Sequence, residues 1–137
     1  MRENVRERLL WVALGGLLYL LFAGAAHAID FTATGTILTV TYTEPTQNTD
    51  GTALDDLAKT SVYYQVGTAA EVKGPDIPAS GPTGGAPIST QITVPIAAGQ
   101  RATVTVRATA TDSSGNESAK SAAVTKTVDR LSPMPPS

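Results

Sequence analysis

Past its N-terminal segment, this chain alternates apolar and polar side chains with a period of two residues. Successive side chains of an extended strand point to opposite faces, so such runs predict strands with one buried face. No stretch after residue 28 repeats at helical spacing, and the chain is therefore expected to be all-β. The apolar positions of the runs are Leu38, Val40 and Tyr42; Val62, Tyr64 and Val66; Ile88, Ile92 and Val94, which share a face with Thr90; Val104, Val106, Ala108 and Ala110; and Val124 and Val128.

Turn and loop sequences separate these runs. Asn48-Thr49-Asp50-Gly51 follows the run around residue 40, and Asp-Ser-Ser-Gly-Asn at 112–116 follows the long run that ends near residue 111. Asn and Gly readily adopt the backbone that tight turns need. Residues 74–87 are rich in Gly and Pro. Because proline cannot donate a ladder hydrogen bond, these residues are expected to form a loop at a sheet edge.

The N-terminal segment has the three parts of a secretory signal peptide. Residues 1–8 contain three arginines, residues 9–26 are uncharged and rich in Leu, and Ala26-His27-Ala28 offers small residues to a signal peptidase. We expect residues 1–28 to be cleaved and the protein to be periplasmic or extracellular. The alternative is an uncleaved membrane anchor, because about 18 apolar residues just span a bilayer.

Composition after residue 28 narrows the chemistry. The only His and the only Trp lie in the N-terminal segment, and Cys is absent from the whole chain. A Ser-His-Asp triad, a Cys nucleophile, a zinc site of imidazole or thiolate and a disulfide are thereby excluded. Charges are scattered and mildly acidic in balance, which argues against nucleic acid or anionic lipid as a partner. We expect the protein to have no enzymatic activity and to bind no cofactor.

Four segments of the chain resemble parts of bacterial fibronectin type III domains. PTQNTDGTALDDLA at 45–58 is similar to the connection between the family's second and third strands, and VYY at 62–64 to the third strand. VRATATDSSGNES at 106–118 resembles the sixth strand and the turn after it, and residues 121–128 fall where the closing strand would lie. The resemblance implies an immunoglobulin-like, seven-stranded antiparallel β-sandwich over residues 29–130, with a Pro-rich tail at 131–137.

The chain departs from that family at positions that are usually aromatic. Tyr42 stands in place of a tryptophan of the second strand, Val104 in place of a tyrosine of the sixth, and Thr60 at an often aromatic place in the third. A core with few rings buries less apolar area, at about 25 cal/mol per Å². We therefore expect a domain of modest stability.

The resemblance also places two loops at one end of the sandwich, here called the loop pole. Loops held on a rigid scaffold are where such domains bind partners. The alternative is that these side chains only form turns, since Asp, Asn, Ser and Gly are turn residues. The candidate binding residues of the loop pole are Asn48, Asp50, Asp112, Ser113, Ser114 and Asn116.

Acidic side chains suggest two further kinds of site. Asp112 with Asn116 and Glu117, and a second group around Asp50, supply oxygen atoms for calcium, but neither has the spacing of a calcium loop, so we expect no metal. Paired carboxylates can act in glycoside hydrolysis, but a small sandwich with few rings offers no deep cleft for a sugar. The pairs considered are Asp55 with Asp56 and Glu44 with Glu71.

Tyr63 is expected to point to solvent, because its neighbours Val62 and Tyr64 alternate with it. An exposed ring could stack on a sugar or a partner, or it could be an ordinary cross-strand neighbour. Asn116-Glu117-Ser118 also fits a glycosylation sequon.

Together these features predict an exported, non-enzymatic binding or adhesion module that contacts a protein or polysaccharide through loops or a sheet face. No membrane partner is expected once the signal peptide is cleaved. The alternative role is structural, as a spacer or a subunit that self-associates through an edge strand. A further alternative is an accessory to a carbohydrate-active enzyme.

Overall fold

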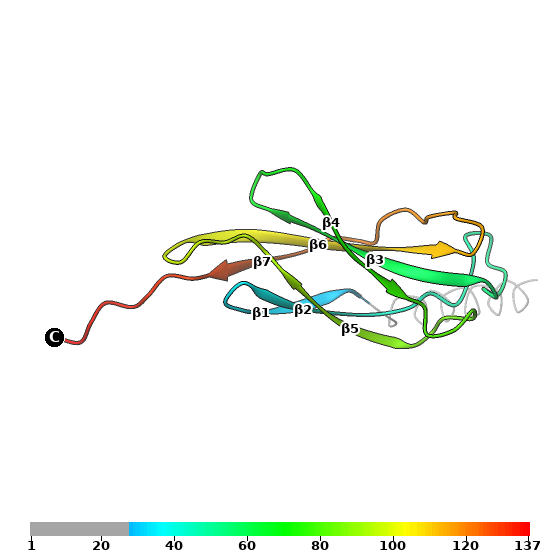
Figure 1. The fold of residues 1–137 in the computed structure, drawn as a ribbon, viewed down its shortest axis with the longest axis horizontal. Helices are drawn as coiled ribbons and strands as arrows, with labels where there is room; N and C mark the ends of the chain where they lie inside the picture. Colours follow the sequence, from blue (N-terminus) through cyan, green and yellow to red (C-terminus); the bar gives the residue numbers. More distant parts are fainter. Residues whose placement is uncertain (1–27) are drawn as a thin grey trace, which may run out of the picture.

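The computed structural model describes residues 28–137, which form two antiparallel sheets packed face to face (Figure 1). One sheet has the strand order β1-β2-β5 and the other β4-β3-β6-β7. The all-β, immunoglobulin-like sandwich of seven strands is thus confirmed, while the predicted signal peptide lies outside the described residues except for its last residue. The strands are β1 Asp30–Thr34, β2 Ile37–Thr43, β3 Leu57–Val66, β4 Val72–Pro78, β5 Pro87–Thr93, β6 Arg101–Asp112 and β7 Val124–Asp129.

The described part of the chain contains no helix long and apolar enough to cross a membrane. Residues 131–137 carry no regular structure and extend away from the sandwich (Figure 1).

The core lies between the sheets and is built from the inward positions of the alternating runs. Leu38 and Val40 of β2 face Val62 of β3 and Val104 and Val106 of β6, and all five are fully buried. Removal of these aliphatic side chains from water is the main term that favours folding. The ring of Tyr64 packs against this cluster, on the face that the sequence pattern predicted.

The alternation of buried and exposed side chains expected for β6 is not found in the second half of the strand. Thr109 and Thr111 are buried, whereas Ala108 and Ala110 are only half-buried. The cause is the chain after β6, which turns back beside it: the Ser118 amide donates to the Ala110 carbonyl at 2.8 Å. Glu117 reaches the outer face of the sheet and accepts a 2.6 Å hydrogen bond from the Thr109 hydroxyl. An outward position of β6 is therefore covered by a later segment of the chain.

The loop predicted for residues 74–87 is wrong for its first part, because β4 extends to Pro78 as an edge strand. Ser61 pairs with Asp76 and Tyr63 with Lys73, so a bulge leaves Gly74 and Pro75 together opposite one residue of β3. A bulge at a sheet edge tolerates proline, since the missing N–H is not needed for the ladder. The loop proper spans residues 79–86.

Glu44 fixes this loop from the end of β2. Its side chain is only 1% exposed. It accepts hydrogen bonds from the amide of Ser80 at 2.8 Å, from the Ser80 hydroxyl and from the amide of Ala86 at 3.3 Å. Buried donors that lose their acceptor are costly, so the loop conformation depends on this carboxylate.

Gly84 provides a test of how tightly the loop packs against the end of β2. It has a φ of +61°, and an added Cβ would lie 2.1 Å from the carbonyl oxygen of Pro45. We expect Gly84→Ala to lower the free energy of unfolding by about 2 kcal/mol or more, because both the φ and the contact are unfavourable to alanine. Urea unfolding followed by circular dichroism measures the change.

Gly81→Ala is the matched control, because it lies in the same loop with open space around its Cβ position. It should change stability by no more than about 0.5 kcal/mol. Equal effects of the two substitutions would show that the loop does not pack on β2 as described.

Candidate functional site

The turn at 112–116 of the loop pole is held by its own side chains. One carboxylate oxygen of Asp112 accepts hydrogen bonds from the amides of Ser114 at 2.9 Å and Asn116 at 2.8 Å. The other oxygen accepts the side-chain amide of Asn116 at 2.8 Å. These bonds, that from the Asn116 side chain above all, hold the pKa of Asp112 below its ordinary value. The polar groups of this turn are thus largely used within the turn.

The other loop of the pole is organised in the same way. Asp50 accepts hydrogen bonds from the amide and the hydroxyl of Thr52, at 3.0 and 2.6 Å. Asn48 donates through its side-chain amide to the Thr52 hydroxyl at 3.1 Å. Side chains that complete a local turn have fewer free donors and acceptors for a ligand.

The fold does bring the two loops together. The amide of Ser113 donates to the carbonyl of Asp56 at 2.8 Å, which ties one loop to the other. A depression of about 290 Å³ lies between them, with Asn48, Asp112 and Asn116 on its wall. The other three predicted residues of the loop pole lie outside this depression.

The acidic groups considered from the sequence are placed differently. In residues 28–137, no three His, Cys, Asp or Glu side chains are arranged to hold a metal ion. Glu44 is bonded to Ser80, whereas Glu71 forms an ion pair with Lys120, so these two carboxylates have separate partners.

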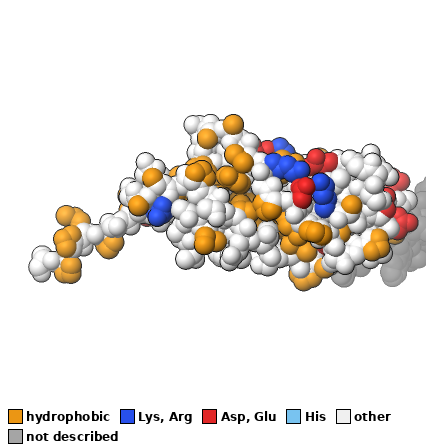
Figure 2. Space-filling model, viewed as in Figure 1, with side chains coloured by type: hydrophobic (Ala, Val, Ile, Leu, Met, Phe, Trp, Pro, Cys, Tyr) orange, Lys and Arg blue, Asp and Glu red, His pale blue; other side chains and the backbone are white. Residues whose placement is uncertain are grey.

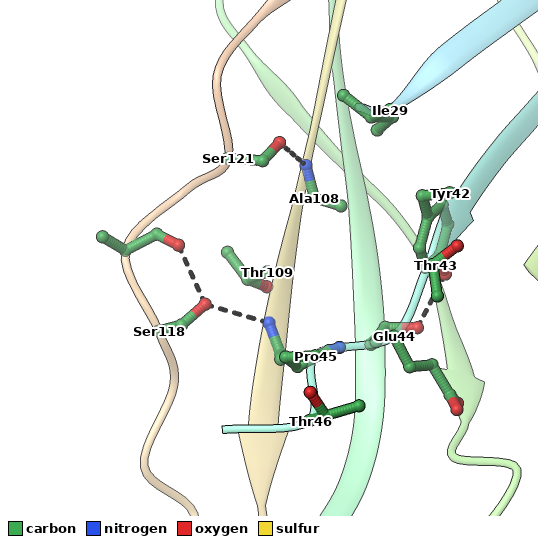
Figure 3. A pocket seen from close by; sticks show the side chains of 13 residues that line it. Ile29, Tyr42, Thr43, Glu44, Pro45, Thr46, Ala108, Thr109, Ser118 and Ser121 are labelled. Carbon is green, nitrogen blue, oxygen red and sulfur yellow. Dashed lines mark hydrogen bonds between the residues drawn. The ribbon is translucent and has the colours of Figure 1, made fainter. Parts of the chain in front are cut away.

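A cavity of about 350 Å³ opens between the sheets (Figure 3). Within it, the hydroxyls of Tyr42 and Thr60 share a buried hydrogen bond of 2.6 Å, so two of the residues that depart from the family pattern contact each other. Across the cavity lie the small side chains of Ala108 and Ala110. Ser118 and Ser121 accept hydrogen bonds from the amides of these alanines, both at 3.0 Å, and so replace strand partners there.

Tyr63 lies on the outer face of the four-stranded sheet and is half-buried there. Its hydroxyl donates to Glu117 at 2.7 Å, and the ammonium of Lys120 sits 4.5 Å from the centre of its ring. The bond to Glu117 raises the pKa of Tyr63. The pKa of Glu117 is lowered, chiefly by the hydrogen bond from Thr109 and then by that from Tyr63. The ring is thus fixed in place, with part of its surface covered.

Further charged side chains lie on this face, and Figure 2 shows basic and acidic side chains gathered over the four-stranded sheet. Asp76 forms ion pairs with Lys59 at 2.7 Å and with Lys73 at 3.1 Å. The bond from Lys59 is the main reason that the pKa of Asp76 lies far below its ordinary value. We call the outer surface of this sheet around Tyr63 the charged face. Its charged residues are Lys59, Glu71, Lys73, Asp76, Arg107, Glu117 and Lys120.

Arg107 is the residue of the charged face that the sequence reasoning missed. It lies directly beside Tyr63 in the register of β3 and β6 and is half-buried. Its Nε atom is buried without a hydrogen-bond partner, and no carboxylate among the described residues forms an ion pair with it. The signal in the sequence was a single arginine among the threonines of the outward positions of β6.

No model of a protein family matches the chain, and no curated protein matches it. Among solved structures, a superoxide reductase from Nanoarchaeum equitans is similar, with a TM-score of 0.40 and 6% sequence identity. The similarity covers 75% of this chain and 91% of that chain. At this TM-score the likeness has no weight in assigning a function.

The depressed pKa values predict the direction of acid unfolding. Asp76, Asp112 and Glu117 have pKa values below their ordinary values of 3.8 for Asp and 4.5 for Glu. The unfolded chain therefore binds more protons near pH 4, and the stability that these groups contribute is lost as the pH falls through 4 and below. Thermal unfolding midpoints measured from pH 7 to pH 2 should fall in that range.

Asp112→Asn should lower the midpoint more at pH 7 than at strongly acidic pH, since the stability that this carboxylate contributes is lost as the pH falls. Asp55→Asn is a matched control, because the Asp55 side chain forms no hydrogen bond or ion pair with a described residue. A midpoint that does not change with pH, or equal effects of the two variants, would contradict the assignment.

Proposed function

We propose that this chain is an exported, non-enzymatic binding module of the fibronectin type III kind, and that its charged face binds a partner that carries carboxylates. The partner is a protein or a polysaccharide with acidic groups. The single observation that carries the proposal is Arg107, a guanidinium that has no anion among residues 28–137 and lies beside a fixed aromatic ring.

The family assignment is supported by where the resembling segments fall. VYY at 62–64 lies in β3, VRATATD at 106–112 lies in β6, and residues 121–128 overlap β7. The fourth strand pairs with the third, in the sheet of β6 and β7. In an immunoglobulin constant domain the fourth strand belongs to the opposite sheet, so that arrangement is not the one adopted here.

The charged face has more positive than negative groups. Its basic side chains are Lys59, Lys73, Arg107 and Lys120, and its acidic ones are Glu71, Asp76 and Glu117. Each acidic group already has a partner on the face. Within the described part of the chain, an incoming carboxylate therefore finds one cation on this face that is not neutralised.

The chemistry of Arg107 favours a carboxylate as its partner. A guanidinium presents donors in a planar fork that matches the two oxygens of a carboxylate, and it is weakly hydrated compared with an ammonium. The ring of Tyr63 beside it offers an apolar surface to a sugar or an aliphatic stem. A charged group next to a rigid ring is also a frequent centre of protein interfaces.

We propose export because residues 1–28 have the three parts of a signal peptide. We propose a binding role without catalysis because no His or Cys occurs after residue 28. The loop pole supports binding less well than the charged face, because the side chains of Asp50 and Asp112 are engaged within their own turns.

Arg107→Gln should weaken binding to an acidic polymer by about tenfold or more, because it removes the cation and keeps a neutral polar side chain in its place. Calorimetric titration with polygalacturonate and with a poly-glutamate peptide, against dextran as the neutral polymer, measures the effect. Binding by the unmodified chain should weaken as salt is added.

Arg101→Gln is the matched control, since it removes the same charge from the same strand, where Arg101 is paired with Asp129 at 2.6 Å. It should leave the affinity within about twofold. Equal losses in both variants would indicate attraction by net charge alone, and no binding to either acidic polymer would refute the proposal.

A further inference from the structure

The strand β5 is an edge strand without charge. It occupies one end of the order β1-β2-β5, so one side of its backbone has no neighbouring strand from residues 28–137. No charged residue occurs from residue 79 to residue 100, a stretch that includes the whole of β5. Figure 2 shows charged side chains over the four-stranded sheet, and hydrophobic or uncharged ones along the lower rim, where Figure 1 places β5. Charges and prolines are the usual protection of an edge, and β5 has only Pro87, at its first residue.

The other edges of the described sheets are protected. β4 contains Lys73, Asp76 and two prolines, and it is bent by its bulge. At the opposite side of the sandwich, Lys126 of β7 donates to the carbonyl oxygen of Phe31 in β1 at 2.6 Å and pairs with Asp30. β5 therefore differs from the edges around it.

The backbone groups that β5 directs outward can be assigned from the hydrogen bonds at its two ends. The Glu44 amide donates to the Ala86 carbonyl at 3.0 Å, and the Val94 amide donates to the Thr36 carbonyl at 2.9 Å. The direction of the backbone N–H and C=O groups alternates from residue to residue along a strand. Between these two points, the backbone groups of the even-numbered residues therefore point toward β2. Ser89, Gln91 and Thr93 direct their N–H and C=O groups away from the sheet.

We propose that β5 pairs with β5 of a second copy of this chain, antiparallel and about a two-fold axis at Thr90. Two three-stranded sheets would then join into one continuous sheet. Ser89 exchanges both backbone hydrogen bonds with Gln91 of the partner subunit, and the Thr93 amide donates to the carbonyl of Pro87 of the partner subunit. The missing N–H of Pro87 therefore falls where the pairing ends.

The sequence of β5 fits this register because it is nearly symmetric about Thr90. Ile88 lies opposite Ile92 of the partner subunit, and Ser89 lies opposite Gln91 of the partner subunit. Cross-strand pairs of β-branched side chains stabilise a sheet, and no like charges meet. A two-fold axis makes the same patch serve both copies, which is the commonest form of self-association. The pairing does not involve the charged face and is independent of the function proposed above.

Sedimentation velocity of the full-length chain, up to millimolar concentration, tests the pairing. We expect a reversible dimer. Ser89→Lys combined with Gln91→Lys should raise the dissociation constant by about a hundredfold, because each lysine then faces a lysine of the partner subunit. Ser89→Lys combined with Gln91→Glu should keep the dimer, because unlike charges then face each other.

The charge-matched variant also tests the register. If the axis lay at Gln91, its glutamates would face each other and the dimer would be lost. A chain that stays monomeric, or a dimer that both variants leave unchanged, overturns the proposal. Circular dichroism melting of each variant at low concentration shows whether the monomer is still folded.

A single cysteine gives an independent readout, since the chain contains none. Residues that face each other without hydrogen bonds in antiparallel strands have Cα atoms about 4.5 Å apart, within the range of a disulfide. Thr90→Cys should therefore form a covalent dimer on oxidation, whereas Thr41→Cys, exposed on β2 of the same sheet, should not. Equal cross-linking by both variants would refute the pairing.

Discussion

The packing of short aliphatic side chains between the two sheets is the constraint on which the rest of this structure depends. Leu38, Val40, Val62, Val104 and Val106 have no exposed surface and join both sheets into one core. Branched side chains with few rotamers pack closely on a pleated surface. Because these residues must point inward, their sequence neighbours in β2, β3 and β6 must point outward. The inward positions therefore also determine which residues form the outer faces of the sheets.

Where rings are absent from the core, polar contacts and small residues take their place. Tyr42 and Thr60 are joined by a hydrogen bond between the sheets, and Glu44 is buried with donors from the loop at 79–86. Such bonds are worth little net but are costly to break, because the remaining group stays buried. They therefore specify the position of the loop and of the sheet end more than they add to stability. The alanines of β6 leave the cavity between the sheets.

The two proposed interaction surfaces lie outside the core, on an outer sheet face and on a sheet edge. The charged face lies on the outside of the four-stranded sheet, and the β5 edge belongs to the other sheet, so one chain can present both at once. Pairing through β5 would place two charged faces in one assembly. Two linked sites bind a repetitive acidic polymer more tightly than either alone, because the second contact becomes intramolecular. The dimer and the binding face can thus support each other while each is tested separately.

The sequence by itself determined the fold class, the inward residues of β2 and β3, and the turns at 48–51 and 112–116, because a period of two and turn chemistry are local properties. It misplaced the loop at 74–87, since whether proline is tolerated depends on the strand being at an edge with a bulge. It also missed the covering of Thr109 and the solitary Arg107, both of which are set by what lies across the sheet. Only the tertiary structure decided these points, because the partner of a side chain on an outer face comes from residues distant in the chain. Local pattern fixes which way a side chain points, and long-range packing fixes what it meets.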